Sequence, residues 1–226
     1  MLLRICRVLE PAELARVRAM LLEADWGDGR ATAGDQSAGV KNNRQLAEDS
    51  QAAQEARQIV SVALARNPMF VTGALPKSVY PPLFNRYGGE ANAFGDHIDN
   101  AVRTHAATAR HVRTDIACTL VLSDSESYDG GELVIGDTYG GQVVKFDAGD
   151  LVMYPASSVH RVEPVTRGER LACFFWIESM VRRDDQRLLL YELDMAILAL
   201  RHEGDSAETV KLTGCYHNLL RMWADV

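Results

Sequence analysis

The sequence predicts a mainly β fold, either a sandwich or a barrel, with helices flanking the β region on both sides. From about residue 75 to 178, short apolar or alternating runs are separated by Gly, Asp and Pro, a pattern typical of antiparallel strands joined by tight turns. Before and after this region, apolar residues recur at helical spacing. The length of 226 residues and the hydrophobic fraction of 47% fit one globular domain. We therefore expect a domain over residues 1–180 and a small helical appendage over residues 181–226.

Two supporting helices are predicted within residues 11–65. The first begins at Pro11, because proline favours the first turn of a helix. Its apolar side chains fall on one side at three-to-four spacing: Leu14, Val17, Leu21 and Leu22. The second helix runs from about Asp49 to Ala65, and its apolar stripe has four members: Ala56, Ile59, Val60 and Leu64. Between the helices, residues 28–43 are small, polar and Gly-rich, so we expect a loop or irregular strands that serve function rather than packing.

Seven strand-like runs follow within residues 75–178. In chain order they are PLFNRY, IACTLVLS, GELVIG, GQVVKF, DLVMYP, HRVEPV and RLACFFWI. After Arg183, helical periodicity returns through DQRLLLYELDMAILALRH, whose expected apolar face contains Leu189, Leu193, Ala196 and Leu200. A final helix is expected to include YHNLLRMWADV. Because both C-terminal helices carry apolar faces, we expect them to serve packing or the formation of a homodimer.

Composition and charge exclude several classes of function. The formal net charge of −7 and the lack of any run rich in Lys and Arg argue against nucleic acid as a partner. No apolar stretch reaches the length of a signal peptide or of a membrane span, so we expect a cytoplasmic protein without membrane association. The 4 cysteines never form CxxC, which leaves neither a zinc knuckle nor a dithiol motif, and reduced thiols are expected.

The stretch FGDHIDN raises the question of a metal site. Residues two apart on a strand point to the same face, so His97 and Asp99 would lie side by side, with Ile98 directed into the packing behind the strand. Alone, this pair is a weak motif and fits a solvated strand equally well. His160 follows the strand-like DLVMYP and a small-residue turn, which places it at a strand edge facing the interior. Two histidines and one carboxylate on a rigid β scaffold form the facial triad that suits non-haem Fe(II).

A cation stands ten residues after His160. Arg170 opens the apolar strand RLACFFWI directly after the turn TRGE. Iron sites of this kind commonly use a keto acid, and the planar guanidinium of arginine is well suited to anchor its distal carboxylate. The alternative is a surface salt bridge between Arg170 and Glu163 or Glu178.

These residues together resemble the Fe(II)- and 2-oxoglutarate-dependent dioxygenases of the prolyl 4-hydroxylase superfamily, in which H-x-D is followed by His and then by Arg ten residues later. The sequence is most similar to the bacterial PKHD-type hydroxylases. Six segments along the whole chain carry this resemblance: GRATAG, VKNN, FNRYGGEANAFGDHIDN, YDGGELVI, YPASSVHRVEPVTRGER and YHNLLRMWADV. The resemblance implies a double-stranded β-helix, which is a jelly-roll barrel, and this agrees with the predicted strands.

The resemblance also implies roles for individual residues. It identifies three iron ligands: His97, Asp99 and His160. Arg170 would pair with the C5 carboxylate of 2-oxoglutarate, and Tyr87 matches a tyrosine that often touches this co-substrate. Trp176 matches an aromatic wall of the same pocket. Phe94 replaces the tyrosine common three residues before the first ligand, so the wall there is apolar. For Phe94 and Trp176, an ordinary place in the core is the alternative.

The implied reaction is hydroxylation of a peptide, protein or small molecule, with 2-oxoglutarate and O₂ converted to succinate and CO₂. L-Ascorbate would keep the iron ferrous, and residues 28–43 are where we expect substrate contacts. Two rival functions remain open. One is an iron- and 2-oxoglutarate-binding sensor that hydroxylates nothing, although every ligand position is filled. The other is a metal-dependent isomerase or hydrolase on a cupin-like barrel, which would have no need of Arg170.

Overall fold

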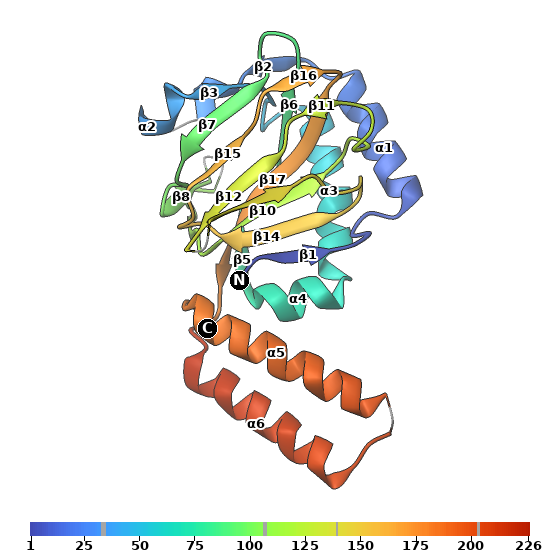
Figure 1. The fold of residues 1–226 in the computed structure, drawn as a ribbon, viewed down its shortest axis with the longest axis vertical. Helices are drawn as coiled ribbons and strands as arrows, with labels where there is room; N and C mark the ends of the chain where they lie inside the picture. The colour runs from blue at the N-terminus through green and yellow to red at the C-terminus, as the bar shows by residue number, and fades with distance from the viewer. Residues whose placement is uncertain (33–34, 106–107, 139, 203) are drawn as a thin grey trace.

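The computed structural model describes residues 1–32, 35–105, 108–138, 140–202 and 204–226. Its centre consists of two facing antiparallel sheets, with helices on the outer side of the larger sheet (Figure 1). The two sheets form the jelly-roll arrangement expected from the sequence, so the predicted fold class is confirmed. None of the described helices combines the length and apolar character needed to cross a membrane.

The larger sheet contains the strand that opens with Arg170. Its strands, in spatial order, are β1 (Leu3–Ile5), β14 (Leu151–Pro155), β10 (Ile116–Val121), β17 (Arg170–Ser179), β6 (Leu83–Tyr87), β4 (Arg44–Leu46) and β2 (Trp26–Asp28), and β5 (Pro76–Val79) pairs with β17 outside this order. The smaller sheet has the order β13 (Gly140–Val144), β12 (Leu133–Asp137), β15 (His160–Val162), β7 (Ala93–His97) and β3 (Lys41–Asn42). The seven predicted runs all contain strands of these sheets.

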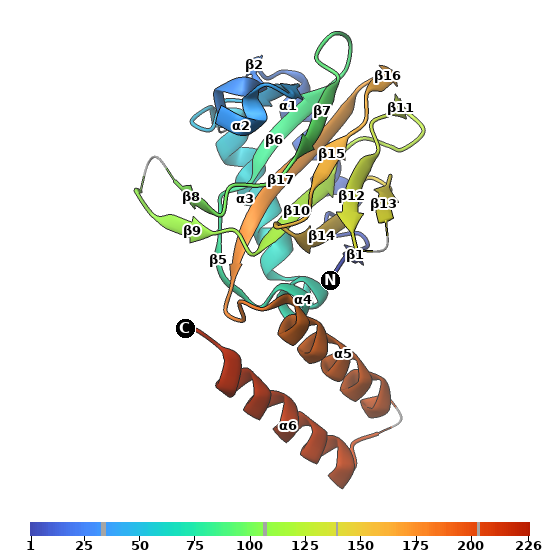
Figure 2. The same cartoon turned by 60° about the vertical axis from the view of Figure 1, so that its left-hand side comes forward.

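Two short strand pairs lie outside the main sheets. One consists of β11 (Asp129–Gly130) and β16 (Val165–Arg167), and the other of β8 (Val102–Thr104) and β9 (His111–Arg113). The β8–β9 pair projects sideways from the barrel (Figure 2). It follows the first two metal-ligand candidates in the chain, so it extends from the neighbourhood of the site.

The N-terminal helices are α1 (Pro11–Leu22), α2 (Asp35–Ala38), α3 (Gln51–Ala65) and α4 (Pro68–Ala74), with a 3₁₀ turn η1 (Gly29–Thr32). The backbone N–H of Glu10 donates to the Glu13 carboxylate at the start of α1, and the Ser50 hydroxyl accepts from Ala53 N–H at the start of α3. Both contacts satisfy backbone donors that a helix leaves unpaired. Within residues 28–43, the described part of the chain contains short helices as well as the expected irregular strands.

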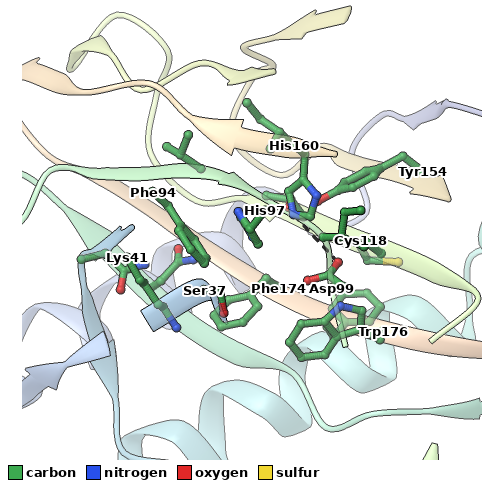
Figure 3. Close-up of a pocket in the computed structure, with 18 of the residues that line it drawn as sticks. Ser37, Lys41, Phe94, His97, Asp99, Cys118, Tyr154, His160, Phe174 and Trp176 are labelled. Atoms are coloured by element: carbon green, nitrogen blue, oxygen red, sulfur yellow. Dashed lines mark ion pairs between the residues drawn. The ribbon is translucent and has the colours of Figure 1, made fainter. Parts of the chain in front are cut away.

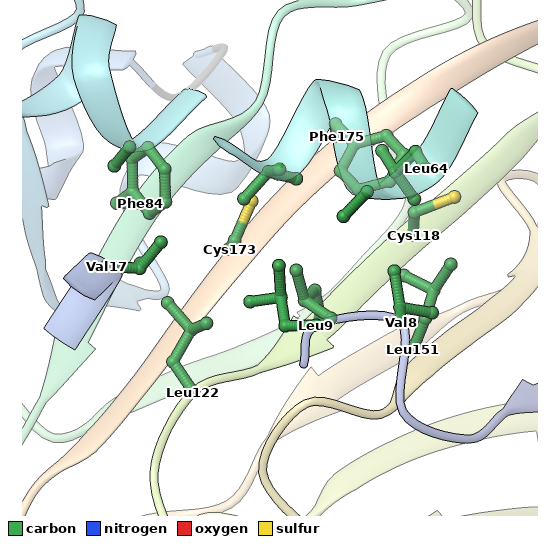
Figure 4. Packing of buried hydrophobic residues seen from close by; sticks show 14 of the residues in the cluster. Val8, Leu9, Val17, Leu64, Phe84, Cys118, Leu122, Leu151, Cys173 and Phe175 are labelled. Carbon is green, nitrogen blue, oxygen red and sulfur yellow. The ribbon is translucent and has the colours of Figure 1, made fainter. Parts of the chain in front are cut away.

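The core is divided between the two faces of the larger sheet. On β17, Cys173 and Phe175 face α1 and α3, whereas Phe174 and Trp176 face the barrel interior, because successive strand residues alternate in direction. Figure 4 shows the helix-side layer: Val8, Leu9, Val17, Leu64, Phe84, Cys118, Leu122, Leu151, Cys173 and Phe175. The expected stripe of α1 was partly wrong, since Val17 and Leu21 are buried but Leu22 is 68% exposed at the last position of the helix.

Helices α5 (Asp184–Arg201) and α6 (Ala207–Trp223) form a hairpin at one end of the molecule, and α5 contacts α4 (Figures 1 and 2). The predicted apolar face of α5 was wrong. Leu189 and Leu200 are 48% and 46% exposed, while Leu190 and Ile197 are buried. Apolar side chains occur around much of α5, so contact with its neighbours, not periodicity, selects which of them become buried.

Candidate active site

The proposed metal ligands converge where β7 meets β15. These strands pair antiparallel, and His160 stands directly opposite His97. Asp99 follows two residues after His97, just beyond the end of β7. One ligand atom from each residue lies within 4.8 Å of the other two, and His160 Nε2 is 3.9 Å from Asp99 Oδ2. Figure 3 shows the three side chains pointing toward one another in the pocket.

Backbone carbonyls orient both imidazole rings. His97 Nδ1 lies 2.8 Å from Gly95 O, and His160 Nδ1 lies 3.0 Å from Ser158 O. A carbonyl can only accept a hydrogen bond, so each Nδ1 carries a proton, and the lone pair of the neutral ring is then on Nε2. Metal-ligating histidines are held in the same way by a partner at the second nitrogen. The arrangement therefore fits a bound metal.

The surroundings of His97 lower the pKa of its imidazole ring. Burial lowers the pKa of His97 to about 4, and the nearby His160 adds to the effect. His97 is consequently neutral at pH 7, which is the form that binds metals. Phe94 stacks on its ring, with centroids 3.6 Å apart. Two imidazoles and one carboxylate, without a thiolate, are donors that suit Fe(II) and leave coordination positions open.

Arg170 lines the same pocket and is 4% exposed. It stands opposite Tyr87 across the β17–β6 pair, and its guanidinium carbon lies 5.3 Å from the Tyr87 ring centre. The salt-bridge alternative finds no support, because Glu163 pairs with Arg161 at 2.6 Å and Glu178 pairs with Arg113 at 3.3 Å. A buried guanidinium that lines a cavity can bind a carboxylate brought by a ligand.

The aromatic candidates also line this pocket. Tyr87 is 1% exposed, and burial raises the pKa of its phenol. Trp176 is 6% exposed and meets Phe174 edge to face, with centroids 5.6 Å apart. Both Phe94 and Trp176 belong to the interior core as well as to the pocket wall. Each of these two residues is therefore both a core aromatic and part of the pocket wall.

One expectation near the ligands was wrong, and several pocket residues were missed, three of which bear on the chemistry of the site. Ile98 is 54% exposed and lines the pocket, because β7 ends at His97 and the alternation of a strand does not continue through Ile98. These three residues are Lys41, Arg103 and Tyr154. Lys41 stands in the VKNN segment of the Gly-rich region, which was a usable signal. Arg103 and Tyr154 had no signal in their local sequence.

Comparison with known proteins identifies the family. A model of the 2OG-Fe(II) oxygenase superfamily matches residues 82–178, and a model of the PKHD-type hydroxylase C-terminal domain matches residues 184–225. The chain is 57% identical to a PKHD-type hydroxylase of Xanthomonas axonopodis pv. citri and 53% identical to one of Polaromonas sp., with all of each chain covered. The chain belongs to the PKHD-type hydroxylase family. It is accordingly an Fe(II)- and 2-oxoglutarate-dependent dioxygenase that hydroxylates a substrate.

A solved structure extends the likeness of this PKHD-type hydroxylase to its fold. A prolyl hydroxylase from Trichoplax adhaerens, in complex with a peptide fragment of the hypoxia inducible factor oxygen degradation domain, superposes with a TM-score of 0.54. The match covers 84% of this chain and 86% of that one, at 16% identity. At that identity the comparison shows a common fold, whereas the substrate depends on the site itself.

Proposed function

We propose that His97, Asp99 and His160 hold the Fe(II) of this dioxygenase. The observation that carries the proposal is the convergence of three donors whose two imidazole rings are fixed by backbone carbonyls. When bound with 2-oxoglutarate and O₂, the iron supplies the oxidising chemistry that hydroxylates the substrate. The protein's own contribution is to hold these groups in place and to exclude competing reactions.

Arg170 and Tyr87 form the co-substrate end of the proposed site. Arg170 binds the C5 carboxylate of 2-oxoglutarate with its planar fork of donors. Because burial raises the pKa of Tyr87, its phenol stays protonated and can donate to the same ligand. Phe94 and Trp176 form apolar walls that keep water from the reacting atoms.

We propose further features of this PKHD-type hydroxylase that rest on its sequence. L-Ascorbate keeps the iron ferrous, and the substrate is a peptide, protein or small molecule that contacts residues 28–43. The dioxygenase unit spans residues 1–180, and residues 181–226 form an appendage whose exposed apolar side chains support a homodimer. A cytoplasmic location is proposed as well.

Spectroscopy tests the proposed ligands. Anaerobic Fe(II) with 2-oxoglutarate should produce a weak visible charge-transfer band in the intact protein. Asp99→Ala should abolish it, because the carboxylate ligand is lost. Asp96→Ala is the matched control, since Asp96 stands in the same stretch but is exposed and pairs with Arg161. An unchanged band in Asp99→Ala would remove Asp99 from the metal site.

Binding measurements test Arg170. Arg170→Ala should weaken 2-oxoglutarate binding by about tenfold or more, as expected for loss of a hydrogen bond between charged groups, with iron affinity largely retained. Arg167→Ala is the control, because that arginine is exposed and pairs with Asp129. Unchanged 2-oxoglutarate affinity in Arg170→Ala would exclude the proposed role. Succinate formation screened against peptides and metabolites would then search for the substrate.

A further inference from the structure

Arg103 in β8 is a pocket-lining cation that the proposed mechanism does not use. Its guanidinium carbon lies 4.3 Å from the Trp176 ring centre and 5.2 Å from that of Tyr80. Its Nε atom is buried and has no hydrogen-bond partner among the described residues. Buried donors of a charged group are rarely left unsatisfied, because a donor that has lost its water and gained no partner destabilises the fold. The geometry therefore calls for an acceptor from outside the chain.

Two aromatic rings connect Arg103 with a second cation. Phe174 and Trp176 face the pocket from β17, and Lys41 Nζ lies 6.0 Å from the Phe174 ring centre. Figure 3 shows Lys41, Phe174 and Trp176 in a row below the metal-ligand cluster. The two cations thus stand at opposite ends of an aromatic floor, which can hold a flat or apolar body between them.

The charge of the pocket opposes that of the whole chain. Among the described lining residues, Lys41, Arg103 and Arg170 are cationic and Asp99 alone is acidic, although the net charge of the protein is −7. The two positive charges of Fe(II) and the two negative charges of 2-oxoglutarate cancel. With both bound, the described lining keeps an excess of positive charge.

Lys41 contributes to this field although it is buried. It is 6% exposed and donates to Gln45 Oε1 at 3.0 Å. Burial, followed by the charge of Arg103, lowers the pKa of Lys41 to about 8. The ammonium therefore remains mostly protonated at pH 7, close enough to Arg103 for their charges to interact.

We propose that the primary substrate carries an oxyanion, a carboxylate or a phosphate, which Arg103 binds against the Trp176 ring. Lys41 adds positive charge at the far end of the aromatic floor, and the apolar part of the substrate lies over Phe174 and Trp176. The carbon to be hydroxylated is then directed toward the metal ligands. This inference rests on the proposed function, because it assigns Arg170 to 2-oxoglutarate and leaves Arg103 for the substrate.

Probe binding tests the inference without knowledge of the substrate. The protein is loaded with Zn(II), and calorimetry first measures 2-oxoglutarate binding. With 2-oxoglutarate saturating, dissociation constants are then measured by ligand-observed NMR for three probes of similar shape: 3-phenylpropanoate, 3-phenylpropanamide and 2-phenylethyl phosphate. The variants are Arg103→Gln and, as a matched control, Arg110→Gln. Arg110 is an exposed arginine close to β9 that is not among the pocket-lining residues.

The expected result is a preference of about tenfold or more for an anionic probe over the amide in the unmodified protein. Arg103→Gln should remove this preference and Arg110→Gln should retain it, with the 2-oxoglutarate affinity alike in all three proteins. The tighter of the two anions decides between carboxylate and phosphate. Equal binding of all probes, or a preference that survives Arg103→Gln, overturns the inference and leaves the proposed function unaffected.

Two further outcomes separate the inference from the proposed function. A weaker affinity for 2-oxoglutarate in Arg103→Gln would assign Arg103 to the co-substrate and overturn the substrate role. Failure of the unmodified protein to bind 2-oxoglutarate would overturn the proposed function, and the inference with it. Because the comparison of anion and amide uses the unmodified protein, it does not depend on the folding of any variant.

Discussion

Gly131 offers a test of how the turn after β11 positions Arg170. Its φ of +68° lies in the left-handed region. A Cβ added there would lie 3.0 Å from Arg170 Cδ and 2.8 Å from Val165 Cγ2. Ordinary carbon contacts are about 3.5–4.0 Å, so Arg170 Cδ must give way by a few tenths of an ångström in Gly131→Ala. The guanidinium is attached to this carbon and moves with it.

Gly89 provides the matched control. Its φ is +59°, and nothing lies within 4 Å of an added Cβ. Both alanine variants should lose about 1–2 kcal/mol of unfolding free energy from the left-handed backbone, or about 2–4 °C in Tm for each kcal/mol. Gly131→Ala should lose more, because its methyl group also meets neighbouring side chains.

The two variants should differ sharply in 2-oxoglutarate binding. A hydrogen bond of about 2.9 Å that lengthens by a few tenths of an ångström is weakened. A hydrogen bond between charged groups is worth about 1.5–3 kcal/mol, so losing part of this energy should lower the affinity by roughly threefold to tenfold. Calorimetry on the Zn(II)-loaded protein measures it, with denaturant unfolding as the measure of stability. Equal affinity for 2-oxoglutarate in Gly131→Ala and Gly89→Ala would refute the reasoning.

Two other predictions concern stability. The pKa of His97 is lowered to about 4 from its usual value of about 6.5, so between these two pH values only the unfolded chain takes up the proton. The metal-free fold should therefore be most stable above pH 6.5 and should lose stability as the pH falls toward about 4. His97→Gln should flatten this pH profile of denaturant midpoints, whereas substitution of the exposed His111 by Gln should leave it unchanged. Leu120→Ala, at a side chain with 0% exposure, should lower the unfolding free energy by about 2–5 kcal/mol, and Leu22→Ala, at 68% exposure, by no more than about 0.5 kcal/mol. Equal losses at the two leucines would contradict the burial of Leu120 in β10 and the exposure of Leu22 at the end of α1.

The strands of the barrel could be predicted from the sequence because their signal is local. In β17 the apolar run RLACFFWI alternates between the helix side and the barrel interior, and Gly168 forms the turn before it with a φ of +71°. The helices α1 and α3 were recognised from their periodicity. These features depend on neighbours within a few residues of one another.

The errors occurred where contacts with distant parts of the chain decide which side chains are buried and where a helix or strand ends. Leu22 fits the stripe of α1, yet the helix ends there and the side chain is 68% exposed. On α5 the apolar residues extend around the helix, and contact with α4 and α6 buries Leu190 and Ile197. Ile98 is exposed because β7 stops one residue earlier. The spacing of apolar residues alone cannot predict where these elements end or which face of α5 is covered.

The sequence by itself determined the chemistry available to this PKHD-type hydroxylase: two histidines, a carboxylate, an arginine at the head of a strand, and the family to which they belong. The tertiary structure decided how these groups meet. Pairing of β7 with β15 places His97 opposite His160, and the contact of Arg103 with the Trp176 ring adds a cation to the pocket beside Arg170 and Lys41. Both contacts join segments far apart in the chain, and such contacts form only when the whole barrel closes.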